Sequence, residues 1–179
     1  RTSLDRFFGD ADGDISLRGV ATRYIENRVD TGVPGAPVLN TVGVNGGQST
    51  TPKWLYRFNA TYDADAWSLT GVARGVSAGK YLANQIECTT NCPTGRTATE
   101  ESQFPTTDDN TVSGAFYVDL NLTMKFDAMR RGDGEFFINV TNVFDSDPIV
   151  LPETGLAANT TYSDLLGRAF RVGVRLELD

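Results

Sequence analysis

The chain has 179 residues, of which 40% are hydrophobic and 22% charged, enough for one domain or part of a larger one. This composition excludes a disordered tail, and the lack of any run of about 18 apolar residues excludes a helical membrane protein. Sixteen basic against 23 acidic residues leave a net charge of −7 and no basic stripe, so no nucleic acid is expected as a partner. The chain has no histidine, and neither an enzymatic activity nor a cofactor is expected.

Alternation of apolar and polar residues predicts an all-β chain with six strands, because successive side chains of a strand point to opposite faces. The alternation is clearest where large apolar residues recur at every second position from Phe116 to Phe126. It is weaker in the first and third strands, where Gly and Ala replace some bulky residues. In chain order the expected strands are Ile15–Ile25, Trp54–Tyr62, Trp67–Val76, Ala115–Phe126, a segment from Phe136 that ends at Phe144, and Phe170–Leu178.

The connections between these strands alternate strictly between short and long. The two short ones run from Tyr62 to Trp67 and from Phe126 to Glu135, whereas 26–52, 80–112 and 145–168 far exceed the usual few residues. All short turns would therefore lie at one end of the sheet, which is typical of an outer-membrane barrel with short periplasmic turns and long extracellular loops. The aromatic girdles of such a barrel would be formed near the strand ends by Trp54, Trp67, Phe126, Phe144 and Phe170.

A soluble β-sandwich or small lipocalin-like barrel alternates in the same way, so the pattern alone leaves both architectures open. The expected strands, about ten to twelve residues long, exceed the usual five or six and match a tilted membrane-spanning strand. Strand length therefore favours the membrane barrel. The alternative is a soluble module that binds a ligand in an apolar interior.

Cys88 and Cys92 are the only cysteines, and three residues separate them in IECTTNCPTG. Turn formers flank both, so the pair could close a small loop disulfide, which would indicate an oxidising compartment. A zinc site would need more thiolates or imidazoles than the chain has. Two unrelated loop thiols are the alternative. No signal peptide precedes Arg1, so in an exported protein we expect one to have been cleaved or the true N-terminus to lie upstream.

Three stretches, in order, resemble the C-terminal strands of TonB-dependent outer-membrane receptors. In FFINVTNVFDSDP, the residues Asn142-Val143-Phe144-Asp145 take the place of the Asn-Leu-Phe-Asp-like element that ends the family's penultimate strand. In YSDLLGRAFRVGVRLEL, Tyr162 to Arg168 take the place of the Tyr-Asp-x-x-Gly-Arg element that opens the last strand. Upstream, TPKWLYRFNATYDADAWSLTGVARGV resembles the family's Pro-Lys-Trp strand, short turn and return strand.

The resemblance implies that residues 1–179 are the C-terminal segment of an antiparallel transmembrane β-barrel, about six strands of a larger, 22-stranded one. Six strands alone would leave two unpaired edges, so further strands are expected outside these residues, and the resemblance implies a plug domain there as well. The chain departs from the family at Leu178-Asp179, where a terminal aromatic is usual.

The function that the resemblance implies is active uptake of a ferric siderophore, cobalamin or a carbohydrate across the bacterial outer membrane. This segment would supply barrel scaffold and extracellular loops. The implied partners are the rest of the barrel, the plug, the TonB complex through the plug, and outer-membrane lipid.

Three motifs are better explained by local structure than by function. Asp10-Ala11-Asp12-Gly13-Asp14 has Ile15 and Ala21 where an EF-hand loop needs glycine and glutamate, which favours an acidic turn before the first strand. Arg131-Gly132-Asp133 is expected in a short turn. The Asn-x-Ser/Thr sequences would accept a glycan only in a eukaryotic secreted protein, and all but the last fall within strands: Asn59, Asn121, Asn139 and Asn159.

Polar residues of the strands would line the barrel interior, namely Arg57, Asn59, Asp119, Asn121, Lys125, Arg171, Arg175 and Glu177. They could contact the plug or the substrate path, but a ladder of cross-strand ion pairs is the favoured interpretation. Ligand contacts are expected from the long outer loops, which contain Tyr81, Phe104 and Leu151. Nothing singles out any of these three, so no substrate-binding, catalytic or metal-binding residue is assigned.

Overall fold

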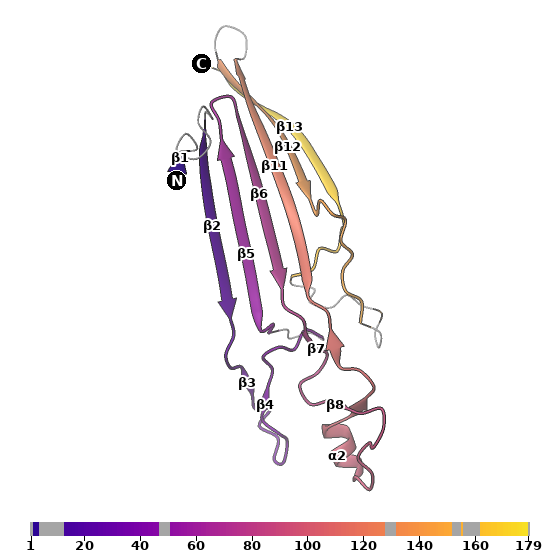
Figure 1. Cartoon of the computed structure of the whole chain (residues 1–179). Coiled ribbons are helices and arrows are strands. Elements are labelled where there is room, and N and C mark those ends of the chain that lie inside the picture. Colours follow the sequence, from indigo (N-terminus) through magenta and orange to yellow (C-terminus); the bar gives the residue numbers. More distant parts are fainter. Residues whose placement is uncertain are drawn as a thin grey trace.

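The computed structural model of the chain describes residues 2–3, 13–46, 51–127, 132–151, 155 and 162–178. Its main feature is a seven-stranded antiparallel sheet in the order β1-β2-β5-β6-β11-β12-β13 (Figure 1). All six predicted strands are present, and the all-β class is confirmed. The strands of the sheet are β1 (Thr2–Ser3), β2 (Asp14–Arg23), β5 (Trp54–Asp63), β6 (Trp67–Val76), β11 (Ala115–Asp127), β12 (Gly132–Thr141) and β13 (Ala169–Leu178).

Each long strand pairs with the long strand that follows it in the chain, so the sheet is a continuous meander. The adjoining ends of β5 and β6 and those of β11 and β12 lie at one end of the sheet, together with the end of β13 (Figure 1). The long connections extend from the opposite end. The predicted separation of short turns from long loops is therefore confirmed.

The long connections contain short elements of their own. The first includes β3 (Arg28–Val29) and β4 (Leu39–Asn40), which pair with each other. The second includes β7 (Gly79–Lys80), β8 (Ile86–Glu87), the helix α2 (Ala98–Gln103), β9 (Thr106–Thr107) and β10 (Thr111–Val112). These two loops are joined directly, since Asn45 Nδ2 donates to Ser77 O and Lys80 N donates to Gly43 O, both at 2.7 Å.

Two predicted strand ends are wrong. β12 ends at Thr141 rather than Phe144, because Asn142 takes a positive φ of 51° and its buried amide exchanges two hydrogen bonds with the backbone of Ser146. Phe144 consequently lies in a turn and is 66% exposed. β2 ends at Arg23 rather than Ile25. Tyr24 N still donates to Lys53 O just beyond the strand, but Ile25 would face Pro52, which has no N–H with which to continue the ladder.

The Arg131-Gly132-Asp133 triplet also differs from the prediction. Gly132 and Asp133 open β12 and pair with Leu178 and Glu177, so they belong to a strand rather than to a turn. Arg131 lies outside the described residues. Asp127 pairs with Asp133 across β11 and β12, which makes this connection shorter than the sequence indicated.

The strand register gathers the large apolar side chains on one face of the sheet, the apolar face. Phe58, Leu120 and Val174 on this face are 47%, 37% and 58% exposed, and no second sheet covers them within the described residues. The apolar face is defined by Ile15, Leu17, Tyr56, Phe58, Tyr62, Trp67, Leu69, Phe116, Val118, Leu120, Leu122, Met124, Phe126, Phe136, Ile138, Val140, Phe170, Val172, Val174 and Leu176.

Several glycines of the sheet lie beneath aromatic rings of the neighbouring strand. Tyr56 covers Gly75 and Phe126 covers Gly134, so closely that a Cβ at either glycine would be 2.4 Å from a ring carbon. Pairing of this kind lets a ring lie flat on the partner strand and compensates for the missing side chain. The weak alternation of β6 therefore reflects close packing under aromatic rings.

The buried side chains lie at the long-loop end. Val76, Ala115 and Tyr117 form one cluster, against which Leu55 and Tyr162 pack. Val112 and Leu151 form a second cluster among the loops. Both lie away from the uncovered apolar face, so the long loops and the adjacent strand ends form the compact part of the molecule.

Candidate functional site: the polar face of the sheet

The face opposite the apolar one carries all eight polar strand residues that the sequence predicted to lie together. The register places Arg57 and Asn59 on β5, three residues on β11 and three on β13, all on this polar face. Their predicted shared orientation is therefore confirmed. Interior placement in a barrel remains a prediction.

The predicted ladder of ion pairs is only partly formed. Arg175 Nη1 of β13 donates to Glu135 Oε2 of β12 at 3.1 Å, and Asn121 of β11 donates to Asn139 of β12. Arg57 reaches only its neighbour, with Nε donating to Asn59 Oδ1 at 3.3 Å. Arg171 has no ion pair within the part of the chain that the structure describes.

The most connected side chain on this face is Arg74 of β6, which the sequence did not single out. Its Nε donates to Asp119 Oδ2 at 3.3 Å and its Nη2 to Asp164 Oδ2 at 3.1 Å. The guanidinium also lies 4.8 Å from the centroid of the Tyr117 ring. Charge, hydrogen bonding and a cation–π contact thus hold one arginine at the meeting point of β6, β11 and the last long loop.

Tyr117 and Tyr162 flank this arginine. Tyr117 is 1% exposed, and its hydroxyl has no hydrogen-bond partner among the described residues. Burial raises the pKa of Tyr162, and contact with the Tyr24 hydroxyl raises it further. This contact joins the loop before β13 to the end of β2 and places Tyr162 as a wall of a cavity on the polar face.

A cavity of about 350 Å³ lies on the polar face beside that wall. Arg57 stands in the middle of its floor, because the register puts it directly between Val20 of β2 and Arg74 of β6. Walls and floor are otherwise mainly apolar, and the lining residues are Val20, Thr22, Leu55, Tyr56, Arg57, Arg74, Gly75 and Tyr162.

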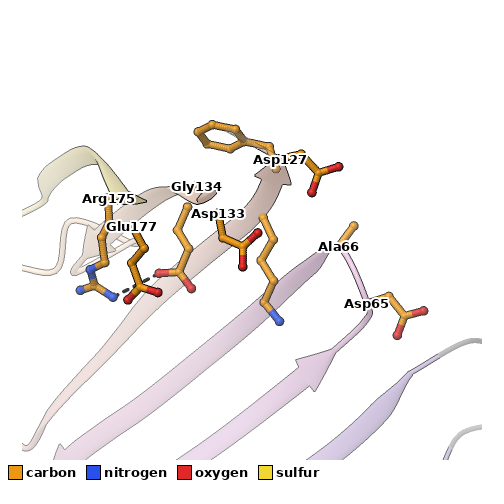
Figure 2. A pocket seen from close by; sticks show the side chains of 10 residues that line it. Asp65, Ala66, Asp127, Asp133, Gly134, Arg175 and Glu177 are labelled. Atoms are coloured by element: carbon orange, nitrogen blue, oxygen red, sulfur yellow. Dashed lines mark hydrogen bonds and ion pairs between the residues drawn. The ribbon is translucent and has the colours of Figure 1, made fainter. Parts of the chain in front are cut away.

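A second, wider pocket of about 620 Å³ lies at the short-turn end of the same face (Figure 2). Asp127, Asp133 and Glu177 occupy one row across three strands, and Asp65 lies at the turn beside them. The next row, Lys125, Glu135 and Arg175, carries alternating charges. Like charges directly opposite each other are unfavourable, so the first row is a site of mutual repulsion on this face.

The two cysteines lie in the second long loop, where the sequence predicted a small closed ring. The Cα atoms of Cys88 and Cys92 are 5.3 Å apart and the sulfurs are within bonding distance. Cα separations of disulfides usually lie between about 4.4 and 6.8 Å. The ring sits between β8 and the segment that leads to α2, where Thr97 caps the helix.

The three loop residues named from the sequence, Tyr81, Phe104 and Leu151, make packing or hydrogen-bond contacts within the loops. Leu151 is 4% exposed and packs on Val112, with Tyr81 against the same cluster. The carbonyl oxygen of Phe104 accepts a hydrogen bond from Arg96. None of the three lines either polar-face cavity.

Of the discounted motifs, residues 10–12 and Asn159 lie outside the described residues. Asp14, the last residue of the acidic motif, opens β2 and pairs with Asp63. Asn59, Asn121 and Asn139 lie within strands, as predicted.

Comparisons with protein-family models, curated proteins and solved structures found no match for this chain. Among the described residues, no helix is long and apolar enough to span a membrane. The same residues contain no group of three or more histidine, cysteine, aspartate or glutamate side chains arranged to hold a metal ion.

The sequence missed Arg74, Tyr117, Tyr162 and Asp164 as a unit. The alternation did give one signal, because Arg74 and Tyr117 fall at the alternate positions of their strands that point to the polar face. The other partner, Asp164, belongs to the loop motif that carried the family resemblance, and only the folded loop brings it to Arg74.

Proposed function

We propose that this chain is the C-terminal barrel segment of a TonB-dependent outer-membrane receptor. The observation that carries the proposal is the apolar face, which spans six consecutive strands and has no cover among the described residues. Six strands about 4.8 Å apart and about 33 Å long make a face on the order of 900 Å². Soluble monomers rarely expose an apolar patch above roughly 300–600 Å².

Strand length supports lipid as the medium that faces these residues. A strand of ten residues is about 33 Å long at about 3.3 Å per residue, and a tilt of about 40° reduces its height to about 25 Å. That height equals the apolar band of an outer-membrane barrel. Trp54, Trp67, Phe126 and Phe170 lie at or next to strand ends, where interfacial girdles form.

The open edges support a larger barrel. β1 is antiparallel to β2, with Thr2 opposite Ile15 and Ser3 opposite Asp14. A strand extended backwards from Thr2 in this register would lie along the outer edge of β2 and satisfy its free backbone groups. In the proposal the preceding strand of the receptor does this, and β13 pairs with the first strand of the barrel.

In this role the chain contributes scaffold and outer loops to uptake of a ferric siderophore, cobalamin or a carbohydrate. The substrate binds at the outer loops and at the plug domain elsewhere in the receptor. The TonB complex, driven by the inner-membrane proton gradient, then rearranges the plug. The long-loop end, with its buried clusters, faces the outside and the short turns face the periplasm.

The first experiment is intact mass spectrometry of the native protein, with and without detergent extraction of bacterial membranes. A species far heavier than 19.4 kDa that appears only in detergent is expected. A soluble monomer of 19.4 kDa would overturn the proposal and favour the soluble binding module.

A pair of substitutions tests the orientation of the faces. Leu120→Arg puts a charge on the apolar face, and we expect a loss of roughly 2–4 kcal/mol in a bilayer and poor insertion. Val72→Arg, between Asn59 and Asp119 on the polar face, should insert normally. Equal insertion of the two variants would contradict a lipid-facing apolar face.

A further inference from the structure

The two arginines that face each other across β5 and β6 differ in their partners, since Arg74 contacts carboxylates and Arg57 does not. Arg57 and Arg74 are directly opposite in register, an arrangement that is unfavourable for like charges. Arg74 is neutralised by two carboxylates, and its Nη1 also donates to the Tyr162 carbonyl oxygen at 3.5 Å. Among the residues that the structure describes, Arg57 has only the neutral Asn59 amide as partner.

The terminal nitrogens of Arg57 therefore have no acceptor among the described residues. Arg18, two residues before Val20 on the same face of β2, also has no ion pair there. The two carboxylates beside Arg74, Asp119 and Asp164, are both used by Arg74 itself. This corner of the polar face thus presents a guanidinium whose planar fork is free to bind an anion.

We propose that the cavity around Arg57, called the Arg57 cavity from here on, binds a small amphipathic anion. The Arg57 guanidinium holds the carboxylate or phosphate group in a two-point contact. Val20, Leu55 and the Tyr162 ring cover the apolar part of the ligand. Thr22 provides a hydroxyl at the rim.

The size and lining of the cavity determine the ligand class. A volume of about 350 Å³ is at the small end of ligand pockets, which suits one ring or a short chain bearing one anionic group. A dianion would meet Asp164 and Asp119 beyond Arg74, so a single charge is favoured. The proposal concerns the polar face only and stands independently of whether the apolar face contacts lipid.

The test uses the native protein purified in detergent, with every part of the barrel present, and takes benzoate as probe and the neutral benzamide as its isostere. Backbone amide shifts at Val20, Leu55 and Arg57 report binding in NMR titrations. We expect saturable shifts with benzoate and none with benzamide. Arg57→Gln should weaken benzoate binding at least tenfold.

Arg171→Gln is the matched control, because Arg171 lies on the same face and, like Arg57, has no ion pair among the described residues, but it belongs to β13 and is away from the cavity. We expect its affinity for benzoate to equal that of the unmodified chain. Equal benzoate affinity in the Arg57 and Arg171 variants would overturn the proposal, as would equal binding of benzamide or no saturable binding at all. Unchanged amide shifts of β11 and β12 in both variants verify the fold.

Discussion

Arg74 and Asp164 are joined by a hydrogen-bonded ion pair at 3.1 Å although 90 residues separate them in the chain. The pair fixes the loop before β13 onto the polar face of β6. Because Asp119 binds the same guanidinium, one cation holds two carboxylates, one on β11 and one in the loop before β13. The long-loop end therefore has a defined arrangement that does not depend on a hydrophobic core alone.

We expect Arg74→Gln to destabilise the long-loop end by roughly 1–3 kcal/mol, because Asp119 and Asp164 would be left close together without a cation. Their side chains are 24% and 15% exposed, so solvent screens them only in part. Arg175→Gln removes a pair whose members are 69% and 37% exposed and should cost less than about 1 kcal/mol. Hydrogen exchange at residues 162–168 measures the first effect. Similar losses of stability in both variants would contradict a structural role of Arg74 beyond that of an exposed ion pair.

Two glycines of β6 should respond differently to the same substitution. A Cβ at Gly75 would be 2.7 Å from the Ala115 carbonyl oxygen and 2.4 Å from the Tyr56 ring, so Gly75→Ala should cost about 1–3 kcal/mol. At Gly71 the nearest atom would be 3.5 Å away, and the substitution should be neutral or stabilise the strand. Thermal unfolding of the two variants, compared in one detergent, checks the difference. Equal melting temperatures would contradict the close packing of Tyr56 on Gly75.

The cap of α2 should be sensitive to acid. The Thr97 backbone N–H and then its hydroxyl donate to the Glu100 carboxylate and lower the pKa of Glu100. A lowered pKa means that the cap contributes stability above the unfolded-state pKa and loses it as the pH falls through the folded-state pKa. NMR titration of the Glu100 carboxyl carbon should give a pKa below the ordinary glutamate value.

Thr97→Ala removes the hydroxyl and should raise the pKa of Glu100 toward that ordinary value. Thr99→Ala, inside α2 and outside the capping box, is the control and should leave the titration unchanged. A Glu100 titration at the ordinary value in the unmodified chain would show that the cap does not form in solution.

Cys88 and Cys92 should resist alkylation until a reductant is added, and mass spectrometry should then find two modified cysteines. A ring of five residues restricts the unfolded chain by about 2 kcal/mol in the chain-entropy model, so the effect should be local. The double variant Cys88→Ser, Cys92→Ser should increase proteolysis near Arg96 and leave the long strands intact. Alkylation of both thiols without reductant would contradict the bridge.

The sequence predicted the six strands well because a period of two is a local property that each strand carries by itself. It failed where the chain leaves the sheet. Val143 and Phe144 are apolar and prolong the strand pattern, yet the Asn142 side chain turns the backbone by hydrogen bonding to Ser146. A hydrogen bond of this kind cannot be recognised from the periodicity of the sequence.

The candidate site was predictable only in outline. The alternation places Arg57 on the polar face, but its lack of a carboxylate partner depends on Asp164 having reached Arg74 from the far end of the chain. Likewise Tyr162 becomes a cavity wall only through its contact with Tyr24. Spacing in the sequence does not determine such long-range contacts.

The meander of the sheet has a consequence for assembly. Every long strand finds its partner in the next long strand of the chain, so no strand has to be threaded between two that are already paired. Starting from the β12–β13 pair, strands can be added one at a time in reverse chain order. Each strand that joins pairs with the edge strand before it and becomes the new edge, to which the next strand is added. Folding can thus proceed strand by strand, and the edges open to mispairing are the newest strand and the outer edge of β13.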